Sequence, residues 1–279
     1  MKKAQLEFVL PSGVRVVATE LYGEHHEILT RQGEDDKKRV NKLIQSLLIS
    51  VGSVKYPNEE FVEGLRSEDR RHILAMCRQA TMDYEKVFEF THKFQDEDGN
   101  MQTLPLKVNL NDQEDAYTEK HIQTLVDKFG AEDEEFYREL NKDGTFRATP
   151  SKHRASEYSD LPKEYETELP KSGLKVKINH LTGKGERQGA SIDRKNISVN
   201  TLLKMRNPRY LHDNGTWIQL NLNNVHSRDL EHLRKLVKEN EGEVEMELRF
   251  ENPAKGSDKY VTVDLLSEIA FFFPSEVLK

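Results

Sequence analysis

Two stretches of this chain follow the same pattern 160 residues apart. The first reads LPSGVRVVATELYG and the second reads LPKSGLKVKINHLTG, so that Ser12 corresponds to Ser172. The same separation relates Asp69 to Asp229 much farther along the chain. Two distant blocks that share one separation indicate an internal repeat, which constrains the architecture more than any single motif does. Further pairs at this separation are Val16 and Val176, Leu21 and Leu181, Gly23 and Gly183, Ser67 and Ser227, His72 and His232, Glu85 and Glu245, and Phe90 and Phe250.

Each copy of the repeat begins and ends with a pattern typical of a β-hairpin. Apolar residues alternate on both sides of the PSG turn in the first copy and of the PKSG turn in the second. Such alternation predicts half-buried strands, and the glycine suits a turn position with positive φ. The alternating runs cover residues 6–10, 14–18, 86–94 and 104–110 in the first copy and 165–169, 174–178, 244–250 and 261–265 in the second.

Between these hairpins the apolar residues recur at the spacing of an α-helix. In the first copy, apolar residues from Val40 to Val51 fall on one face of a predicted helix, and Gly52 is expected to end it. The second copy has a shorter apolar stretch at a comparable place, ended by Pro208. A further helix is expected to begin at Ser67 and at Ser227, because a serine can cap a helix and the aspartate two residues later favours its positive N-terminus.

Polar residues on these helices are expected to be structural. His72 and His232 occupy matched positions, and each is expected to hydrogen-bond a buried carbonyl or a neighbouring acid. Cys77 lies on the apolar face of its helix, where a small buried thiol is the usual finding and a nucleophile the exception.

These patterns predict an α+β fold made of two diverged copies of a hairpin-helices-hairpin unit. Between the copies, apolar residues from Ile122 to Leu140 predict a helix or a pair of helices, interrupted near Gly130. The stretch that follows is poor in apolar residues and rich in turn formers, which is typical of a linker. We therefore expect a first α+β copy over residues 1–117, a helical insert and polar linker over 118–160, and a second α+β copy over 161–279.

Charge and composition restrict the functional classes. Of the 279 residues, 35% are hydrophobic and 33% charged, so the cores are modest and the surface is thickly charged. The net charge of −7 repels phosphate, which argues against general nucleic-acid binding and favours proteins as partners.

The single cysteine excludes an internal disulfide and suits a reducing compartment. No stretch approaches the roughly 18 apolar residues of a membrane span. We expect a soluble protein of the cytosol.

Three stretches invite a metal-binding or catalytic interpretation. His25 and His26 lie beside two glutamates, and imidazole and carboxylate both bind zinc, but adjacent side chains on a helix point apart. The segment Gly183–Gly189 is rich in glycine but lacks the spacing of a phosphate-binding loop, which favours a plain loop between strand and helix. The acidic turn at residues 96–99 lacks the further ligands of a calcium loop. We expect no catalytic, cofactor or metal residues; the alternative is a metal-dependent or nucleotide-using enzyme at one of the first two stretches.

The C-terminus carries the strongest candidate for a protein-docking surface. Phe271, Phe272 and Phe273 stand immediately before Pro274. Three adjacent aromatic side chains do not all face one core in a helix or a strand, so at least one is directed toward an edge or a partner. Filling of a core by these aromatics is the alternative.

The combined motifs resemble a known group of proteins. In the first copy they are LPSG, LYGEHHEIL and LRSEDRRHILAMCRQA, and in the second they are LPKSG, LTGKGE, HSRDLEHL and the terminal FFFP. Over most of each copy, though not the middle segment, the chain resembles the baseplate hub and tail assembly proteins of contractile-tailed bacteriophages of the T-even type. Members of that family often carry paired cysteines between the last strands. This chain has none there, which puts a metal-stabilised hairpin in doubt.

The resemblance implies a non-enzymatic part of the tail or its baseplate, or a helper in building it. The implied partners are other phage tail or baseplate proteins in a multi-subunit assembly, with no nucleic acid and no cofactor. The implied location is the host cytoplasm during assembly, and the virion tail if the protein is a structural component. A chain with two domains can bind two neighbours at once and gain affinity from their linkage.

Overall fold

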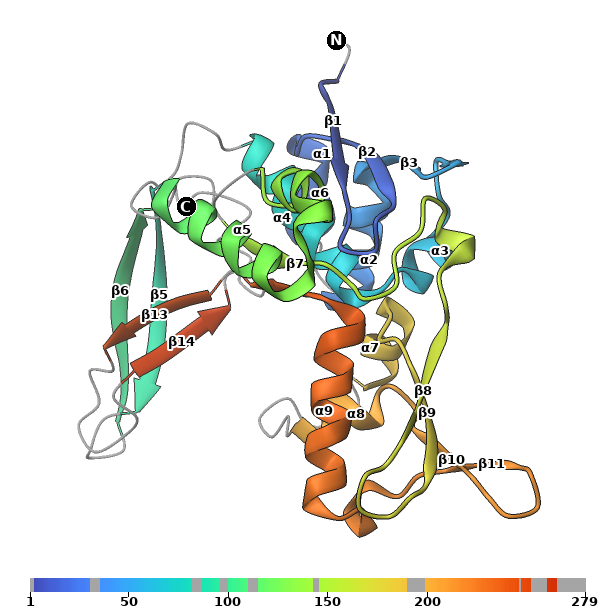
Figure 1. Ribbon diagram of the computed structural model, residues 1–279. Helices are drawn as coiled ribbons and strands as arrows, with labels where there is room; N and C mark the ends of the chain where they lie inside the picture. The colour runs from blue at the N-terminus through green and yellow to red at the C-terminus, as the bar shows by residue number, and fades with distance from the viewer. Residues whose placement is uncertain are drawn as a thin grey trace.

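The computed structural model describes most of the chain (Figure 1). The described residues are 3–30, 36–81, 87–95, 100–109, 115–142, 146–189, 199–245, 247–251 and 260–264. Helices and antiparallel sheets are both present, so the predicted α+β class is confirmed. Within these ranges no helix combines the length and the apolar character needed to cross a membrane.

The first half of the chain forms a four-stranded antiparallel sheet packed against helices. Across the sheet its strands are β1 (Gln5–Val9), β2 (Arg15–Thr19), β3 (Leu48–Val51) and β4 (Val54–Lys55), in that order. The predicted first hairpin is β1–β2, in which Phe8 lies opposite Val16. The helices are α1 (Gly23–Thr30), α2 (Asp36–Leu47), α3 (Glu59–Gly64) and α4 (Ser67–Thr81). The predicted closing hairpin follows as β5 (Val87–Gln95) and β6 (Met101–Asn109).

The helix predicted up to Gly52 ends earlier than expected. α2 stops at Leu47, and the chain continues as strand β3 paired with β2. Gly52 has a φ of +54° in the turn between β3 and β4, not at a helix end. Leu48 and Val51 are buried in this strand. The predicted helix would have buried the same two side chains. The prediction was wrong because apolar spacing over so few residues does not distinguish the two conformations.

The part between the halves contains the predicted pair of helices. Gly130 separates them with a φ of +111°. Phe146, Ala148 and Leu161, which belong to the following stretch, are buried in the core of the first half. This stretch therefore contributes to that core. The elements are α5 (Asp115–Phe129), α6 (Glu134–Leu140), strand β7 (Arg147–Thr149) and a 3₁₀ turn at Tyr158–Asp160.

The second half follows a similar order of elements, and its sheet and helices lie below the first half in Figure 1, whereas its last hairpin, β13–β14, is drawn at the left with β5 and β6. Its four-stranded sheet has the order β8, β9, β10, β11, which matches β1 to β4. The run predicted over 244–250 is divided: β12 pairs with β7, and β13 pairs with β14. The elements are β8 (Glu164–Glu168), β9 (Lys175–Asn179), α7 (Gly183–Gly189), α8 (Val199–Lys204), β10 (Arg209–Leu211), β11 (Trp217–Gln219), a 3₁₀ turn (Leu222–Asn224), α9 (Ser227–Glu241), β12 (Glu243–Glu245), β13 (Glu247–Glu251) and β14 (Tyr260–Asp264).

The turns of the two opening hairpins both end on a glycine with positive φ, although the second turn is one residue longer. Gly13 and Gly173 both have positive φ, at +87° and +70°. The N–H of Gly13 donates to the carbonyl of Leu10, and that of Gly173 donates to the carbonyl of Leu169, both at 2.8 Å. The repeated pattern in the sequence thus corresponds to a repeated local structure. That the two halves arose by duplication stays a prediction.

The matched aspartates join each long helix to the opening hairpin of its own half. The carboxylate of Asp69 in α4 accepts the N–H of Ser12 at 3.1 Å. The carboxylate of Asp229 in α9 accepts the N–H of Ser172 at 3.1 Å and that of Lys171 at 2.7 Å. The same kind of contact therefore holds the turn against the helix in both halves.

The matched serines do not cap these helices as predicted. The capping side chain of α9 is His226, whose Nδ1 accepts the N–H of Arg228 at 3.2 Å. The buried hydroxyl of Ser67 has no hydrogen-bond partner among the described residues, and its N–H donates to Leu181 in the other half. The cap prediction was wrong because both helices begin at the serine itself, so the cap position falls on the preceding residue, which is His226 for α9.

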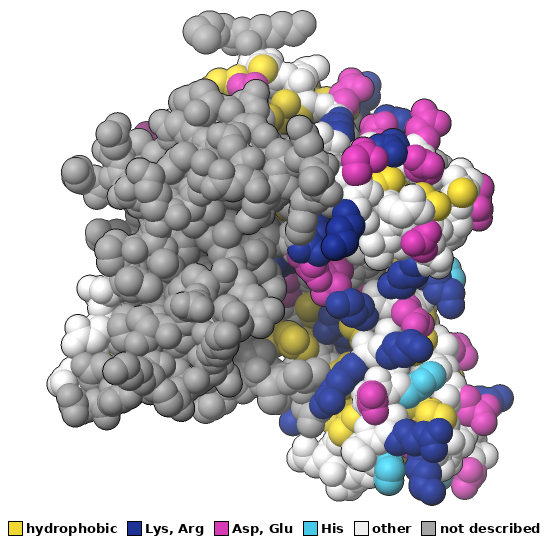
Figure 2. Space-filling model, turned by 60° about the vertical axis from the view of Figure 1, so that its left-hand side comes forward, with side chains coloured by type: hydrophobic (Ala, Val, Ile, Leu, Met, Phe, Trp, Pro, Cys, Tyr) yellow, Lys and Arg dark blue, Asp and Glu magenta, His cyan; other side chains and the backbone are white. Residues whose placement is uncertain are grey.

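Two main cores underlie the two halves. Phe8, Ile44 and Ile73 are fully buried in the first, and Val176 and Leu233 are fully buried in the second. A smaller cluster lies between α5 and α6. Figure 2 shows basic and acidic side chains interspersed over the described part of one face, as the charged composition leads one to expect.

Candidate functional site

The adjacent histidines of the alternative site lie on α1. His25 is fully buried, and its Nδ1 accepts the N–H of Tyr22 at 2.7 Å. Its Nε2 lies 3.7 Å from Glu24, an exposed carboxylate that also pairs with Lys3. Burial lowers the pKa of His25. His26 is half-buried. Over the described residues, no group of three His, Cys, Asp or Glu side chains is arranged to hold a metal ion.

The glycine-rich segment Gly183–Gly189 forms helix α7, not the loop that was predicted. The hydroxyl of Thr182 accepts the N–H of Gly185 at 3.3 Å and so supports the first turn. A Cβ at Gly183 would lie 2.6 Å from the guanidinium of buried Arg70 in α4. The loop interpretation was wrong because glycine here permits a close approach between the halves and does not mark a turn.

The matched histidines have structural partners. The Nε2 of His72 lies 3.0 Å from the buried carbonyl of Leu140, as predicted. The Nε2 of His232 lies 2.9 Å from the hydroxyl of Thr167 instead of a carbonyl or an acid. Cys77 is fully buried, and this burial raises the pKa of its thiol, so it is not a poised nucleophile.

Two predicted features lie outside the described residues. They are the docking residues Phe271, Phe272 and Phe273 and the acidic turn at 96–99.

The two halves meet at a contact surface that we call the seam, formed by residues 62–71 of the first half against 180–187 and 240–245 of the second. Its backbone contacts resemble a short strand pairing. The N–H of Ser67 donates to Leu181 at 2.9 Å, and the N–H of Gly183 donates to Leu65 at 3.3 Å. Between them lies an antiparallel bridge from residue 66 to residue 182. The seam therefore fixes α4 and α7 relative to each other.

A half-buried carboxylate, that of Glu68, contributes to the seam beside β12. Glu68 accepts the N–H of Val244 at 2.8 Å, while Arg71 donates to the carbonyl of Val244 at 3.2 and 3.3 Å. Arg71 lies 3.7 Å from Glu68. Desolvation raises the pKa of Glu68 to about 7, and the charges of Glu241 and Glu243 add to this effect.

A buried ion pair lies on the second-half side of the seam. Arg206 donates to both oxygens of Glu241, at 2.7 and 2.6 Å. Glu241 also accepts the N–H of Leu181 and the hydroxyl of Tyr165, both at 3.3 Å. These hydrogen bonds satisfy the carboxylate, so the pair has a structural role.

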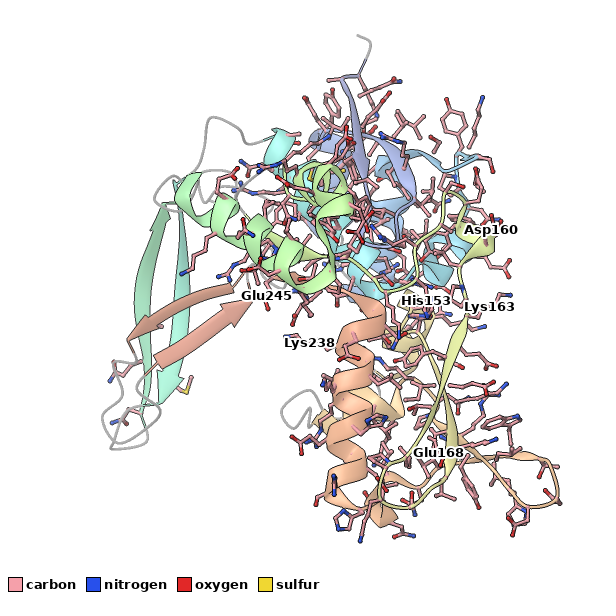
Figure 3. The ribbon with its side chains drawn as sticks, in the orientation of Figure 1. His153, Asp160, Lys163, Glu168, Lys238 and Glu245 are labelled. Carbon is pink, nitrogen blue, oxygen red and sulfur yellow. The ribbon has the colours of Figure 1, made fainter. Side chains whose placement is uncertain are left out.

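Arg66 is the buried cation at the centre of the seam, with 5% of the residue exposed. Its guanidinium donates to the hydroxyl of Ser151 at 3.1 Å and to the carbonyls of His153 and Pro162 at 3.4 and 2.9 Å. All three acceptors are neutral oxygens. Figure 3 shows His153 where the two halves meet. The guanidinium of Arg66 is thus hydrogen-bonded, but no carboxylate of the described residues pairs with it.

The carboxylate of Asp69 reaches Arg66 only through a tyrosine. The hydroxyl of Tyr158 accepts the backbone N–H of Arg66 and donates to Asp69 at 3.2 Å. The charge of Arg66 acts to lower the pKa of Asp69, but burial outweighs it and the pKa is raised.

His180 is a buried imidazole whose ring nitrogens both lack a hydrogen-bond partner within the described chain. It is 5% exposed, and its ring packs edge-on against Tyr165 at a centroid distance of 5.0 Å. Burial, together with the charges of Arg66, His153 and Arg206, lowers the pKa of His180 to about 3. The ring is therefore neutral at physiological pH and holds an unused N–H donor and an unused acceptor.

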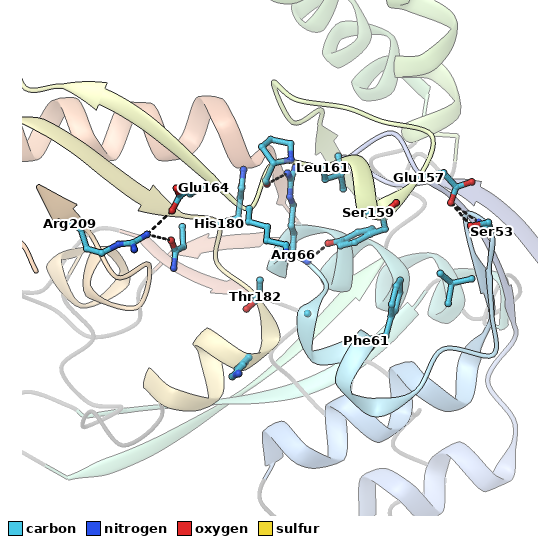
Figure 4. Close-up of a pocket in the computed structure, with 17 residues that line it drawn as sticks. Ser53, Phe61, Arg66, Glu157, Ser159, Leu161, Glu164, His180, Thr182 and Arg209 are labelled. Atoms are coloured by element: carbon cyan, nitrogen blue, oxygen red, sulfur yellow. Dashed lines mark hydrogen bonds and ion pairs between the residues drawn. The ribbon is translucent and has the colours of Figure 1, made fainter. Parts of the chain in front are cut away.

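Arg66 and His180 line a cavity of about 760 Å³ at the seam. Figure 4 shows the two side chains next to each other, with Arg209 and Glu164 toward one end of the cavity and Glu157 and Ser53 toward the other. Three parts of the chain supply the wall: the first half, the connecting segment and the second half. The first half supplies Phe61 and Arg66, the connecting segment supplies Tyr158 and Lys163, and the second half supplies His180 and Arg209.

Sequence reasoning did not identify Arg66 or His180 as site residues. They come from different halves: Arg66 lies in the stretch LRSED and His180 in the stretch NHLTG, and nothing in the sequence shows that these two stretches meet. The closest signal was the segment Gly183–Gly189, which borders the cavity through Lys184. That segment was considered for phosphate binding on its own, whereas the cavity depends on residues that only the folded chain brings together.

Comparison of the chain with protein-family models, with curated proteins and with solved structures finds no match in any of the three.

Proposed function

We propose that this protein is a non-enzymatic structural or assembly component of a phage-like tail baseplate, and that it acts by binding other proteins. The observation that supports the proposal is the repeated order of elements in two halves that the seam holds in a fixed relation. A chain of this kind can present two related but different surfaces to two neighbours. Binding at one surface then raises the effective concentration at the other.

The seam uses its carboxylates for structure. Asp69 accepts the N–H of a hairpin turn, Glu68 accepts the N–H of β12, and Glu241 is paired with Arg206. The Glu68 contact joins the two halves, whereas the contacts of Asp69 and Glu241 each hold elements within one half. Carboxylates committed to such contacts favour a structural role over acid-base catalysis. This use of buried charge supports a binding role.

The experiment is purification of the tagged full-length protein from bacteria in which phage tails are being assembled. Mass spectrometry would identify and quantify the proteins that co-purify. We expect tail or baseplate proteins in stoichiometric amounts. Their absence, with the tagged protein folded and abundant, would contradict the proposal. Mass spectrometry of finished tails then separates a structural component, which is retained, from a chaperone, which is not.

Two exposed apolar residues provide matched probes of the two surfaces. Tyr56, next to β4 in the first half, is 76% exposed, and Ile218 in β11 of the second half is 39% exposed. If the chain bridges two neighbours, Tyr56→Ser and Ile218→Ser should each weaken the capture of a different partner. Loss of the same single partner from both variants would contradict bridging.

A further inference from the structure

The cavity at the seam contains basic side chains without acidic partners. Lys163 and Lys184 line it, both are exposed, and neither forms an ion pair with any residue that the structure describes. Figure 3 shows Lys163 at the junction of the two halves. Arg66 adds a buried charge whose acceptors are all neutral. Three basic residues therefore line the same space without an ion-pair partner among the described residues.

The carboxylates that line the cavity are already engaged. Glu164 accepts hydrogen bonds from Lys177 at 3.0 Å and from Arg209 at 2.6 Å. Glu157 accepts the N–H and the hydroxyl of Ser53 at 2.9 and 2.7 Å. The lining thus has more basic than acidic side chains, although the whole chain carries a net charge of −7. Such local accumulation of positive charge attracts anions.

His180 gives a second and independent indication of a ligand. It is more than nine-tenths buried and lines the cavity, yet its two nitrogens have no partner in the described chain. A buried polar group without a hydrogen bond costs on the order of 1–3 kcal/mol. Native structures rarely leave such a group unpaired unless water, an ion or a ligand supplies the bond.

We infer that the seam cavity is a binding site for a small anion that carries phosphate or carboxylate oxygens. Lys163 and Lys184 attract the anion at the surface, Arg66 provides the positive inner wall, and His180 offers a neutral N–H donor beside it. The cavity volume of about 760 Å³ is within the range of sites for small molecules. Because both halves and the connecting segment form the wall, a bound anion also strengthens the seam.

The test is isothermal titration calorimetry of the full-length protein at pH 7 and constant ionic strength. Inorganic phosphate and citrate are titrated separately, with sodium chloride as the reference salt. We expect saturable one-to-one binding of at least one of the two anions. Binding of phosphate alone assigns a phosphate ligand, and binding of citrate alone assigns a carboxylate ligand.

Paired variants locate the site. In Lys163→Gln/Lys184→Gln the affinity should fall at least tenfold. The control, Lys120→Gln/Lys175→Gln, removes two other exposed lysines outside the lining, and its affinity should change less than twofold. His180→Phe keeps an aromatic ring but removes both nitrogens, so it should also weaken binding while leaving thermal unfolding of the unbound protein close to wild type.

Two results would overturn the inference. One is the absence of binding for both anions, in which case ordered water satisfies His180. The other is binding that survives in Lys163→Gln/Lys184→Gln but is lost in the control pair, which would place the anion elsewhere. Neither result bears on capture of tail proteins, so an anion site here and the proposed assembly role are tested separately.

Discussion

At the scale of single residues, two aspartates matched in sequence hold matched contacts in unlike electrostatic settings. Burial raises the pKa of Asp69, against the opposing charge of Arg66. Desolvation acts to raise the pKa of Asp229 as well, but the N–H groups of Lys171 and Ser172 outweigh it and hold this pKa below its ordinary value. The two aspartates thus make the same kind of hairpin contact, but ionisation is disfavoured for Asp69 and favoured for Asp229.

Removal of these carboxylates should destabilise the protein unequally. Asp69→Ala leaves the N–H of Ser12 unpaired in a buried position, so we expect a loss of about 2 kcal/mol in the free energy of unfolding. Asp229→Ala leaves the backbone N–H groups of Lys171 and Ser172 without their acceptor. Both residues are exposed, so water can replace the carboxylate, and we expect a loss of about 1 kcal/mol in the free energy of unfolding. Urea denaturation measures both.

The control for this comparison is Asp213→Ala, which removes an exposed aspartate. Its unfolding free energy should stay within about 0.5 kcal/mol of wild type. If Asp69→Ala behaved like this control, the carboxylate would not be what holds the first hairpin to α4.

At the scale of elements, the opening hairpins share a turn glycine with positive φ but meet different surroundings. A Cβ at Gly173 would have no heavy atom within 4 Å. A Cβ at Gly13 would lie 2.9 Å from the Cβ of Arg154 and 3.2 Å from the carbonyl oxygen of Ala155. The turn of the first half is covered by the connecting segment, whereas that of the second half is open.

This difference predicts the cost of adding a methyl group at each turn. Gly173→Ala should lower the free energy of unfolding by roughly 1–2 kcal/mol, which is the penalty of a positive φ for a residue with a Cβ. Gly13→Ala should cost at least about 1 kcal/mol more, because the segment at 154–155 must also move. Thermal and urea unfolding of the two variants test the order, and equal losses would show that the connecting segment does not press on the first turn.

At the scale of the whole molecule, the seam makes stability depend on pH. The pKa of Glu68 is about 7 in the folded protein, compared with 4.5 for an ordinary glutamate. The folded state therefore binds this proton more tightly than the unfolded state does. Stability from this group is fully present below pH 4.5 and is lost as the pH rises through 7, levelling off about one unit above it.

Glu68→Gln should remove this dependence while keeping an oxygen that accepts the N–H of Val244. We expect the variant to equal wild type near pH 4 and to exceed it by about 3 kcal/mol at pH 8. Urea denaturation from pH 4 to pH 8 measures the difference between the two proteins. Glu60→Gln, which changes an exposed glutamate on α3, is the control and should show no such growth. A difference that stayed constant with pH would show that Glu68 does not titrate in this range.

Much of the fold follows from local pattern. The hairpin β1–β2, the hairpin β8–β9 and helices α4 and α9 lie where alternation and helical spacing predicted them. The hairpins β3–β4 and β10–β11 were not predicted, because strands of two to four residues are too short to show a period. Pairing with β2 and β9 decides their conformation.

The sequence by itself determined that two similar units follow each other, where their turns fall, and that Asp69 and Asp229 hold equivalent places. These features depend on neighbouring residues and on repetition, both of which a linear pattern records. Only the tertiary structure decided that Arg66 and His180 meet at a seam, that β12 pairs with β7, and that a cavity with a basic lining lies between the halves. Contacts between residues so far apart depend on how the units dock, and docking is set by shape and burial that no local period encodes.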